Sequence, residues 1–106
     1  MKHLNIDGIV VLVGENAKEN HDLLDMDIVD GDHIWMHHRD NPSAHVIVCS
    51  ETVHRTVLEK AAVYCIRKTN GRKTKDYVIW ARVRDVTKCK TKGQVKVSTS
   101  TEMFVK

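Results

Sequence analysis

The sequence lacks the features that are typical of disordered, membrane, secreted and disulfide-rich proteins. It holds one proline and five glycines, with no runs of either that would indicate a disordered tail. Its apolar runs are short, residues 9–13 among them, and its first residues lack the apolar core of a signal peptide, so neither a membrane span nor export is indicated. Three cysteines without a CxxC spacing favour free thiols over a disulfide framework. We therefore expect one intracellular, cytoplasmic domain over residues 1–106.

What is present is a chain of 42% hydrophobic residues that follow the periods of short strands and helices. Strands are expected over residues 2–6, 9–13, 76–84, 86–92, 94–98 and 102–105, and on both sides of a turn at Asn41. One helix is expected after Asn16, which caps it with Glu19 three positions on. A second is expected from Thr52 to about residue 68, with an apolar stripe of Val53, Val57, Ala61 and Cys65. This order predicts an α+β domain, a mostly antiparallel sheet with two helices packed on one face.

The segment 33–45 contains four of the seven histidines and one of the two tryptophans. Its turn residues lie around Asn41, and pairing that is symmetric about this residue places His37 opposite His45. The alternate positions form a wholly apolar face: Ile34, Met36, Val46 and Val48. Because that face suits the core, Trp35, His37 and His45 are expected side by side on the other face, where a functional site is predicted.

Each of these side chains has an alternative role. Trp35 suits base stacking, because indole stacks on any base, but a strand tryptophan also packs in a core. His37 and His45 can donate to phosphates or 2′-hydroxyls, hold one another's tautomer, or be satisfied histidines at the edge of the core. A zinc site that includes Cys49 is disfavoured, because about four strand residues, roughly 13 Å, separate Cys49 from His45. No metal or other cofactor is therefore expected.

The charge is divided between the halves of the chain, although the net charge is +3. Residues 1–54 hold three Lys/Arg against ten Asp/Glu, giving −7, whereas residues 55–106 hold fourteen against four, giving +10. This division predicts a positive face that binds the phosphates of nucleic acid or an acidic surface. The residues expected to form it are Arg72, Lys73 and Lys75 in a loop, Arg82 and Arg84 on one strand, and Lys88, Lys90 and Lys92 on the next. Alternatively, these charges are simply solvated or protect an edge strand from aggregation.

One set of motifs runs through most of the chain: Gly14 followed by Asn16 and Asn20, Ile-Trp-Met-His at 34–37, Asp-Asn-Pro-Ser-Ala-His at 40–45, Ala-Ala at 61–62 and Lys-Thr-Lys-Gly at 90–93. At this spacing the motifs resemble the NFACT-R domain, the RNA-binding module of the NFACT proteins, which act in ribosome-associated quality control. The resemblance covers residues 14–105, and its most specific part is Trp-x-His followed by His45. The chain departs from the family pattern at His33, where the family usually has Asp, and at Ser43-Ala44, where it has Gly-Ser.

The resemblance implies an RNA-binding module of translation or ribosome quality control, with ribosomal RNA, transfer RNA or the ribosome as partner. The catalytic-like and coiled-coil segments of full-length NFACT proteins are not in this sequence, so we expect a stand-alone version without peptide-tailing activity. An RNA-processing or RNA-modifying enzyme with His37 and His45 as general acid and base is the alternative. We expect binding without catalysis, through the basic residues above and through Trp35, His37, Arg39 and His45 of the hairpin. The sequence leaves the oligomeric state open.

Overall fold

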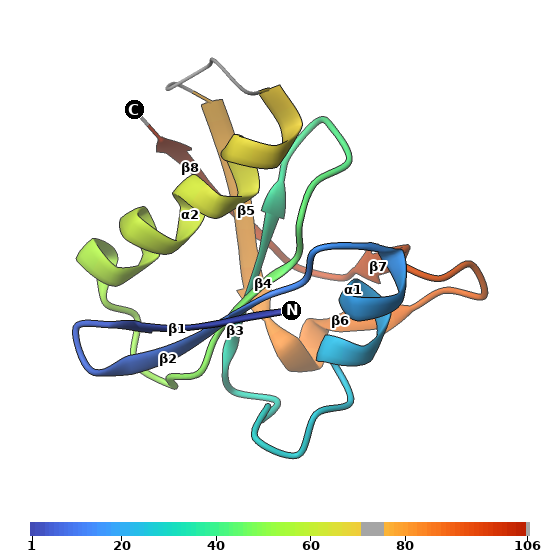
Figure 1. Ribbon diagram of the computed structural model, residues 1–106, viewed down its shortest axis with the longest axis horizontal. Helices are drawn as coiled ribbons and strands as arrows, with labels where there is room; N and C mark the ends of the chain where they lie inside the picture. The colour runs from blue at the N-terminus through green and yellow to red at the C-terminus, as the bar shows by residue number, and fades with distance from the viewer. Residues whose placement is uncertain (71–75, 106) are drawn as a thin grey trace.

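The structure, a computed structural model, describes residues 1–70 and 76–105, and a six-stranded sheet forms its centre (Figure 1). The strands of this sheet are β1 Lys2–Ile6, β2 Ile9–Val13, β3 Ile34–His38, β4 Val46–Val48, β5 Asp76–Arg82 and β8 Thr101–Val105. They lie in the order β1-β2-β4-β3-β5-β8, each antiparallel to its neighbours. The other elements are the helices α1 Ala17–Leu23 and α2 Arg55–Asn70, the 3-10 turn η1 Val83–Asp85, and a hairpin of β6 Val86–Lys88 with β7 Val95–Val97. The α+β class and the antiparallel sheet are confirmed.

Two hairpins of the sheet form where local turn chemistry predicts them. Asp7 and Gly8 have φ angles of 53° and 87°, the left-handed values that favour a tight two-residue turn between β1 and β2. In the second hairpin Trp35 lies opposite Ile47, as symmetric pairing predicts. A one-residue slip would move the side chains of one strand to the opposite face of the sheet, where they would not fit the packing of either face, so the packing fixes this register.

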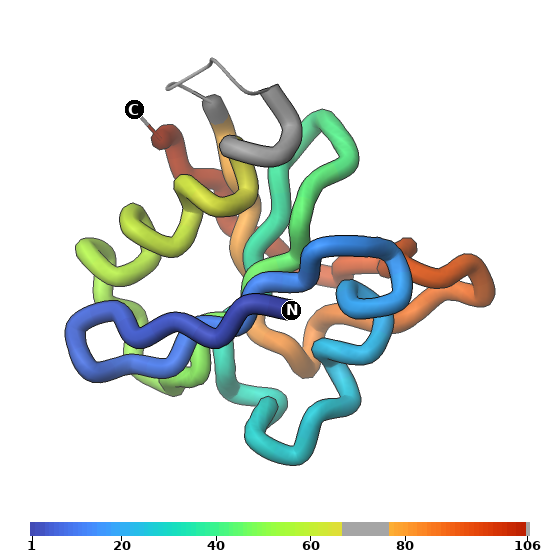
Figure 2. Tube along the Cα trace, viewed as in Figure 1, coloured from blue at the N-terminus to red at the C-terminus, as the bar shows by residue number. Residues whose placement is uncertain are grey.

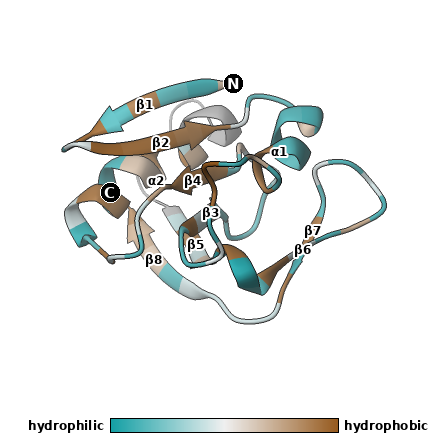
Figure 3. Cartoon of the chain, turned by 90° about the horizontal axis from the view of Figure 1, so that it is seen from below, coloured by the Kyte–Doolittle hydropathy of each residue, from teal (hydrophilic) through white to brown (hydrophobic). Residues whose placement is uncertain are grey.

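The two helices pack on opposite faces of the sheet, which corrects the expectation of two helices on one face (Figure 1). The helix α2 packs on the face that carries Val11 and Met36. The opposite face carries Leu12 and Trp35, and it is covered by Leu23 of α1 and by the β6–β7 hairpin. All five residues of β2 are apolar (Figure 3). A strand that is buried on both faces shows no alternation of polar and apolar residues, so this run is the sequence feature that indicates packing on both faces of the sheet.

The first helix begins as predicted, whereas the second begins three residues later than Thr52. The Asn16 side-chain oxygen accepts a hydrogen bond from the Glu19 amide at 2.9 Å, which caps α1. The Thr52 amide donates to the Ser50 hydroxyl at 3.2 Å, so Thr52 belongs to a local turn. Val53 consequently lies before the helix and is 43% exposed. The rest of the predicted stripe is buried: Val57, Ala61 and Cys65.

The strands near the C-terminus are shorter than predicted, which separates residues expected to share one face. The strand β5 ends at Arg82, and Arg84 lies in η1, because the chain there bends to hydrogen-bond the loop before β3. The strand β6 ends at Lys88, because a turn follows in which the Cys89 amide donates to the Gln94 carbonyl at 3.0 Å. The structure thus contradicts a single basic strand face formed by Lys88, Lys90 and Lys92.

The chain path places the first and last strands, β1 and β8, at opposite edges of the sheet (Figure 2). Between them, the face that carries Trp35 is covered at one end by α1 and the β6–β7 hairpin. We call this surface the Trp35 face, and it positions the candidate site. Among the described residues, neither helix combines the length and the apolar content that crossing a bilayer demands.

Candidate nucleic-acid interface

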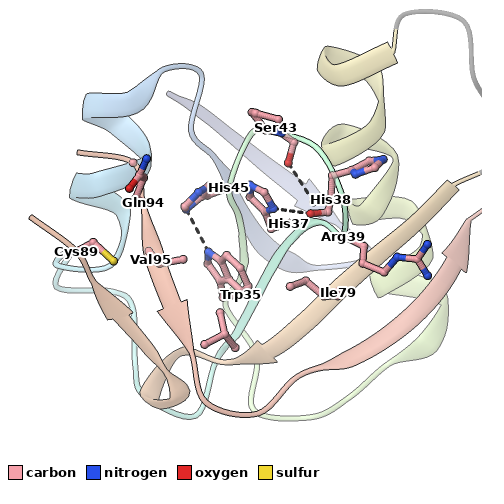
Figure 4. A pocket seen from close by; sticks show the side chains of 13 residues that line it. Trp35, His37, His38, Arg39, Ser43, His45, Ile79, Cys89, Gln94 and Val95 are labelled. Carbon is pink, nitrogen blue, oxygen red and sulfur yellow. Dashed lines mark hydrogen bonds between the residues drawn. The ribbon is translucent and has the colours of Figure 1, made fainter. Parts of the chain in front are cut away.

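Three ring side chains cluster at the hairpin end of the Trp35 face (Figure 4). Trp35 and His37 stack with ring centroids 5.6 Å apart and an interplanar angle of 8°. His45 meets both rings edge-on, at 5.5 Å from Trp35 and 4.9 Å from His37. The alternation along β3 and the symmetric turn bring these side chains together, as the sequence predicts.

The His45 side chain is buried within the cluster, and its ring already has hydrogen-bond partners within the protein. Nδ1 accepts a hydrogen bond from the Trp35 indole Nε1–H at 3.2 Å, so the neutral ring carries its proton on Nε2. The ring also has a hydrogen bond with the backbone of Gly93. His45 is 2% exposed, and burial, assisted by the neighbouring His37, lowers the pKa of His45 to about 4. Trp35, and not His37, therefore sets the tautomer of His45, and a neutral buried imidazole is poorly suited to bind phosphate.

Gly14 and Asn20, two residues of the motif that follows β2, fix the backbone of His45. The Gly14 amide donates to the His45 carbonyl at 2.9 Å, and Asn20 Oδ1 accepts from the His45 amide at 3.1 Å. A Cβ atom at position 14 would lie 2.1 Å from Asn20 Oδ1, so this close approach requires glycine. Both residues therefore support the site from outside the hairpin.

His37 is the histidine of the cluster that remains partly exposed. Its Nδ1 lies 2.6 Å from the His38 carbonyl oxygen and donates to it, which leaves Nε2 of the neutral ring as an acceptor. Burial is the largest cause of the lowered pKa of His37, so the ring is neutral at pH 7. His37 is thus suited to accept a hydrogen bond from a 2′-hydroxyl or a base amino group, more than to pair with a phosphate.

Hydrogen bonds within the turn hold the tip of the β3–β4 hairpin. The His38 amide donates to Ser43 Oγ at 3.0 Å. His38 Nδ1 accepts from the amides of Asp40 and Asn41, each at 3.0 Å. The run Asp-Asn-Pro-Ser therefore holds the buried residue His38 as well as the turn, because two of its amides donate to the His38 ring and its serine hydroxyl accepts from the His38 backbone amide.

A pocket of about 460 Å³ opens in front of the ring cluster (Figure 4). One side of the pocket comes from the β3–β4 hairpin, including His37 and Arg39, and the other from the β6–β7 hairpin, including Cys89 and Gln94. Small-ligand sites have volumes of roughly 300–1,000 Å³, so the pocket has the size class of a site for a single nucleotide. Sequence reasoning does not find Cys89 and Gln94, because only the crossing of the β6–β7 hairpin over the Trp35 face brings them there.

Trp35 forms the floor of the pocket and is only 1% exposed. His37 stacks on it, and Val86, Val95 and Val97 of the β6–β7 hairpin pack against its cluster. The packing role, which the sequence left as the alternative to base stacking, is the one that this geometry supports. The β6–β7 hairpin covers this part of the Trp35 face. In the part of the chain that the structure describes, no three His, Cys, Asp or Glu residues converge to hold a metal ion.

The structure divides the predicted basic residues into paired and unpaired ones. Arg84 pairs with Asp32, and Lys88 pairs with Asp25, so acidic residues of the N-terminal half neutralise both. Arg82 donates to two backbone carbonyls, each at 2.6 Å. These three side chains are therefore engaged with the protein itself. Three further predicted residues lie outside the described residues: Arg72, Lys73 and Lys75.

Lys90 and Lys92 are exposed and form no ion pair within residues 1–70 and 76–105. Both lie in the turn of the β6–β7 hairpin, next to Cys89 and Gly93, which line the pocket. They are the part of the predicted basic surface that the fold brings to the Trp35 face. Arg39, from the opposite side of the pocket, pairs with Asp40 at 3.0 Å.

The chain is similar to known proteins in sequence and in fold. Residues 2–100 match the model of the family described as NFACT protein RNA binding domain. A stretch of 57 residues, 53% of this chain, is 35% identical to the Rqc2 homolog RqcH of Bacillus subtilis (strain 168), and it covers 10% of that protein. The fold is similar to the structure of the C-terminal of the fibronectin/fibrinogen-binding protein from Streptococcus suis, with a TM-score of 0.86 and 21% identity over 97% of this chain and 43% of that chain. The chain thus spans less than half the length of each of these relatives.

Proposed function

The chain belongs to the family of NFACT protein RNA binding domains, and on this basis we propose that it binds RNA in translation or ribosome quality control. The 35% identity with a Bacillus subtilis protein that is named as an Rqc2 homolog supports this setting. Ribosomal RNA and transfer RNA are the partners we propose, with the ribosome as the place of action and the cytoplasm as the compartment. Because the matched stretch covers a tenth of that relative, its activity as a whole protein is not assumed.

The observation that carries the proposal is the pocket on the Trp35 face, which His37 lines as a neutral acceptor. Beside it in the chain, next to the lining residues Cys89 and Gly93, are two exposed lysines, Lys90 and Lys92, that have no ion pair among the described residues. The acceptor suits a ribose hydroxyl or a base edge, groups that distinguish RNA and its unpaired bases. The lysines suit the phosphates, which dominate affinity without specifying sequence. Trp35 and His45 support this arrangement by holding the ring of His37 and the pocket floor in place.

The first test replaces the two lysines of the β6–β7 turn together, Lys90→Gln and Lys92→Gln. We expect weaker binding of every RNA tested, by several-fold at low salt, because phosphate contacts are lost. For single-stranded RNA, each contact contributes roughly 0.7 to the slope of log affinity against log salt, so the slope should fall by about 1.4. Fluorescence anisotropy with a labelled RNA at several salt concentrations measures both quantities.

A matched control is the pair Lys2→Gln and Lys60→Gln, which removes the same charge elsewhere. Lys60 lies on α2, on the far face of the sheet, where it pairs with Asp7 at 3.0 Å. This control should keep the salt slope and most of the affinity. Equal losses in the two double variants would show that only net charge matters. A wild-type protein that binds no RNA even at low salt would overturn the proposed function.

The alternative of an RNA-processing enzyme has one supporting observation, the neutral His37 side chain that lines an open pocket. A general base needs such a neutral acceptor, but catalysis also needs a positioned nucleophile or water and a group that stabilises the developing charge. We propose binding without turnover, so labelled RNA incubated with the protein should be recovered intact. Cleavage that disappears in a folded His37→Ala variant would show instead that the domain is an enzyme.

A further inference from the structure

Two exposed aromatic side chains extend the Trp35 face beyond the pocket. Tyr77 on β5 lies opposite Phe104 on β8, and their ring centroids are 5.1 Å apart with the planes tilted by 52°. Tyr77 is 39% exposed and Phe104 is 45% exposed. Large aromatic rings bury more apolar area than most side chains when they are covered, so an open pair on a sheet indicates a surface that meets a partner.

Strand alternation shows that this pair shares the face of the pocket. Along β5, Tyr77 points to the same side as Ile79, which lines the pocket, and as Ala81, which packs with Trp35. The residues between them point the other way, and Val78 is buried in the core under α2. The same alternation on β8 buries Met103 and Val105 beneath α2 and leaves Phe104 on the open side.

Arg39 connects the aromatic pair to the pocket. It lines the pocket, its amide donates to the Tyr77 carbonyl at 3.0 Å, and its guanidinium carbon lies 4.3 Å from the centroid of the Tyr77 ring. Figure 4 shows the side chain extending across β5, away from the histidines. The pocket, Arg39 and the aromatic pair therefore form one continuous surface.

We propose that Tyr77, Phe104 and Arg39 form a base-stacking platform that binds unpaired nucleotides of single-stranded RNA next to the pocket. This inference rests on the proposed function and names the kind of RNA that the Trp35 face takes. Flat rings and a guanidinium plane are the groups on which unstacked bases pack, and they do so with any base. One strand of RNA then places one base in the pocket and its neighbours on the platform.

The charges around the platform favour bases over phosphates at this position. Arg39 is already paired with Asp40 at 3.0 Å and with Glu102 at 3.5 Å, so two carboxylates oppose a phosphate beside it. A base is uncharged and meets the ring faces without that penalty. Duplex RNA, whose bases are stacked internally and whose phosphates face outward, gains nothing from such a surface.

The test compares Phe104→Leu and Tyr77→Leu with wild type, using a single-stranded RNA that carries 2-aminopurine and a hairpin duplex of similar length. Leucine keeps the surface apolar but removes the aromatic ring. Loss of one stacked base should weaken single-strand binding roughly tenfold, and the quenching of 2-aminopurine should be lost, while duplex binding and the salt slope stay unchanged. Phe104→Trp should restore both affinity and quenching. Ile28→Ala, at a side chain that is 51% exposed away from these strands, is the matched control.

The outcomes separate this inference from the proposed function. Unchanged single-strand affinity and quenching in both leucine variants, with weakened binding in the Lys90 and Lys92 double variant, would overturn the platform and leave RNA binding in place. Failure of wild type to bind any RNA would overturn both. Circular dichroism and thermal melting establish that each variant is folded. Phe104 lies on an edge strand and is nearly half exposed, so Phe104→Leu is expected to fold.

Discussion

At the scale of single residues, His37 and His45 show how one side-chain type takes two roles within one hairpin. His45 is buried, and its Nδ1 accepts from Trp35. His37 keeps one nitrogen for a partner beyond its bond to the His38 carbonyl. The sequence predicts that the two rings meet, because strand pairing is a local property. It does not predict which ring is satisfied, because that depends on Trp35 and on Gly93, a residue 48 positions along the chain from His45.

The lowered pKa of His45 gives a prediction for stability against pH. Its pKa is about 4 in the folded protein and 6.5 in an unfolded chain, so the unfolded state binds the proton first as the pH falls. The contribution of His45 is fully present above pH 6.5 and should decline by about 2 kcal/mol between pH 7 and pH 5, since each pKa unit corresponds to about 1.4 kcal/mol. The lowered pKa of His37, which faces His45, adds a change of the same sign. Urea unfolding at a series of pH values measures it.

His45→Gln is the matched variant for this titration, because glutamine still has an oxygen to accept the Trp35 hydrogen bond and does not titrate. Its stability should be lower at pH 7 but should change less between pH 7 and pH 5 than that of wild type. The same pH dependence in both proteins would show that other groups cause it, and would contradict the assignment to His45.

At the scale of elements, the hairpins are predictable because the turn and its strands are adjacent in sequence. Asp7-Gly8 and the turn at Asn41 set their registers locally. The ends of β5 and β6 are not predictable in this way. Alternating residues continue past Arg82 and Lys88, but long-range hydrogen bonds to the loop before β3 and the tight turn after Cys89 end the strands there. The face that α1 covers likewise depends on tertiary packing.

The contact between the β2–α1 connection and the hairpin gives a prediction at this scale. Gly14→Ala places a Cβ atom 2.1 Å from Asn20 Oδ1, which forces Asn20 away from the His45 amide. We expect a loss of roughly 2 kcal/mol in the free energy of unfolding, because overpacking adds to a buried amide left without its partner. Weaker RNA binding should accompany it, because the pocket is built on this hairpin. Thermal or urea unfolding together with an RNA titration measures both.

A double-mutant cycle with Asn20→Ala identifies the cause. If the side-chain clash is responsible, the double variant should lose less stability than the sum of the two single variants, because the Ala side chain removes the clashing oxygen. Additive losses would show that position 14 acts independently of Asn20. Gly8→Ala is a useful comparison, since a Cβ there meets nothing within 4 Å and only the positive φ opposes it.

At the scale of the whole molecule, the division of charge along the sequence does not become a division between two surfaces. Acidic residues of the first half pair with basic residues of the second: Asp7 with Lys60, Asp25 with Lys88 and Asp32 with Arg84. Composition gives the total charge, but it cannot give these pairs, because each joins residues more than fifty positions apart. The positive charge left beside the pocket is therefore much smaller than the +10 of the C-terminal half suggests.

This pairing predicts that removing acidic residues near the site should strengthen RNA binding. Asp25→Asn and Asp32→Asn together release Lys88 and Arg84 from their carboxylate partners while keeping the size of each side chain. The exposed ion pairs contribute little to folding, so the stability should change by less than about 1 kcal/mol. If the released cations reach the phosphates of an RNA bound at the β6–β7 hairpin, the affinity at low salt should rise several-fold. The salt slope should then steepen by about 0.7 for each new phosphate contact with a single strand.

Asp7→Asn, which releases Lys60 on the far face of the sheet, is the control for this prediction and should raise the affinity for RNA much less. An equal gain in Asp7→Asn would mean that RNA responds to net charge alone, and that the Trp35 face does not direct the binding.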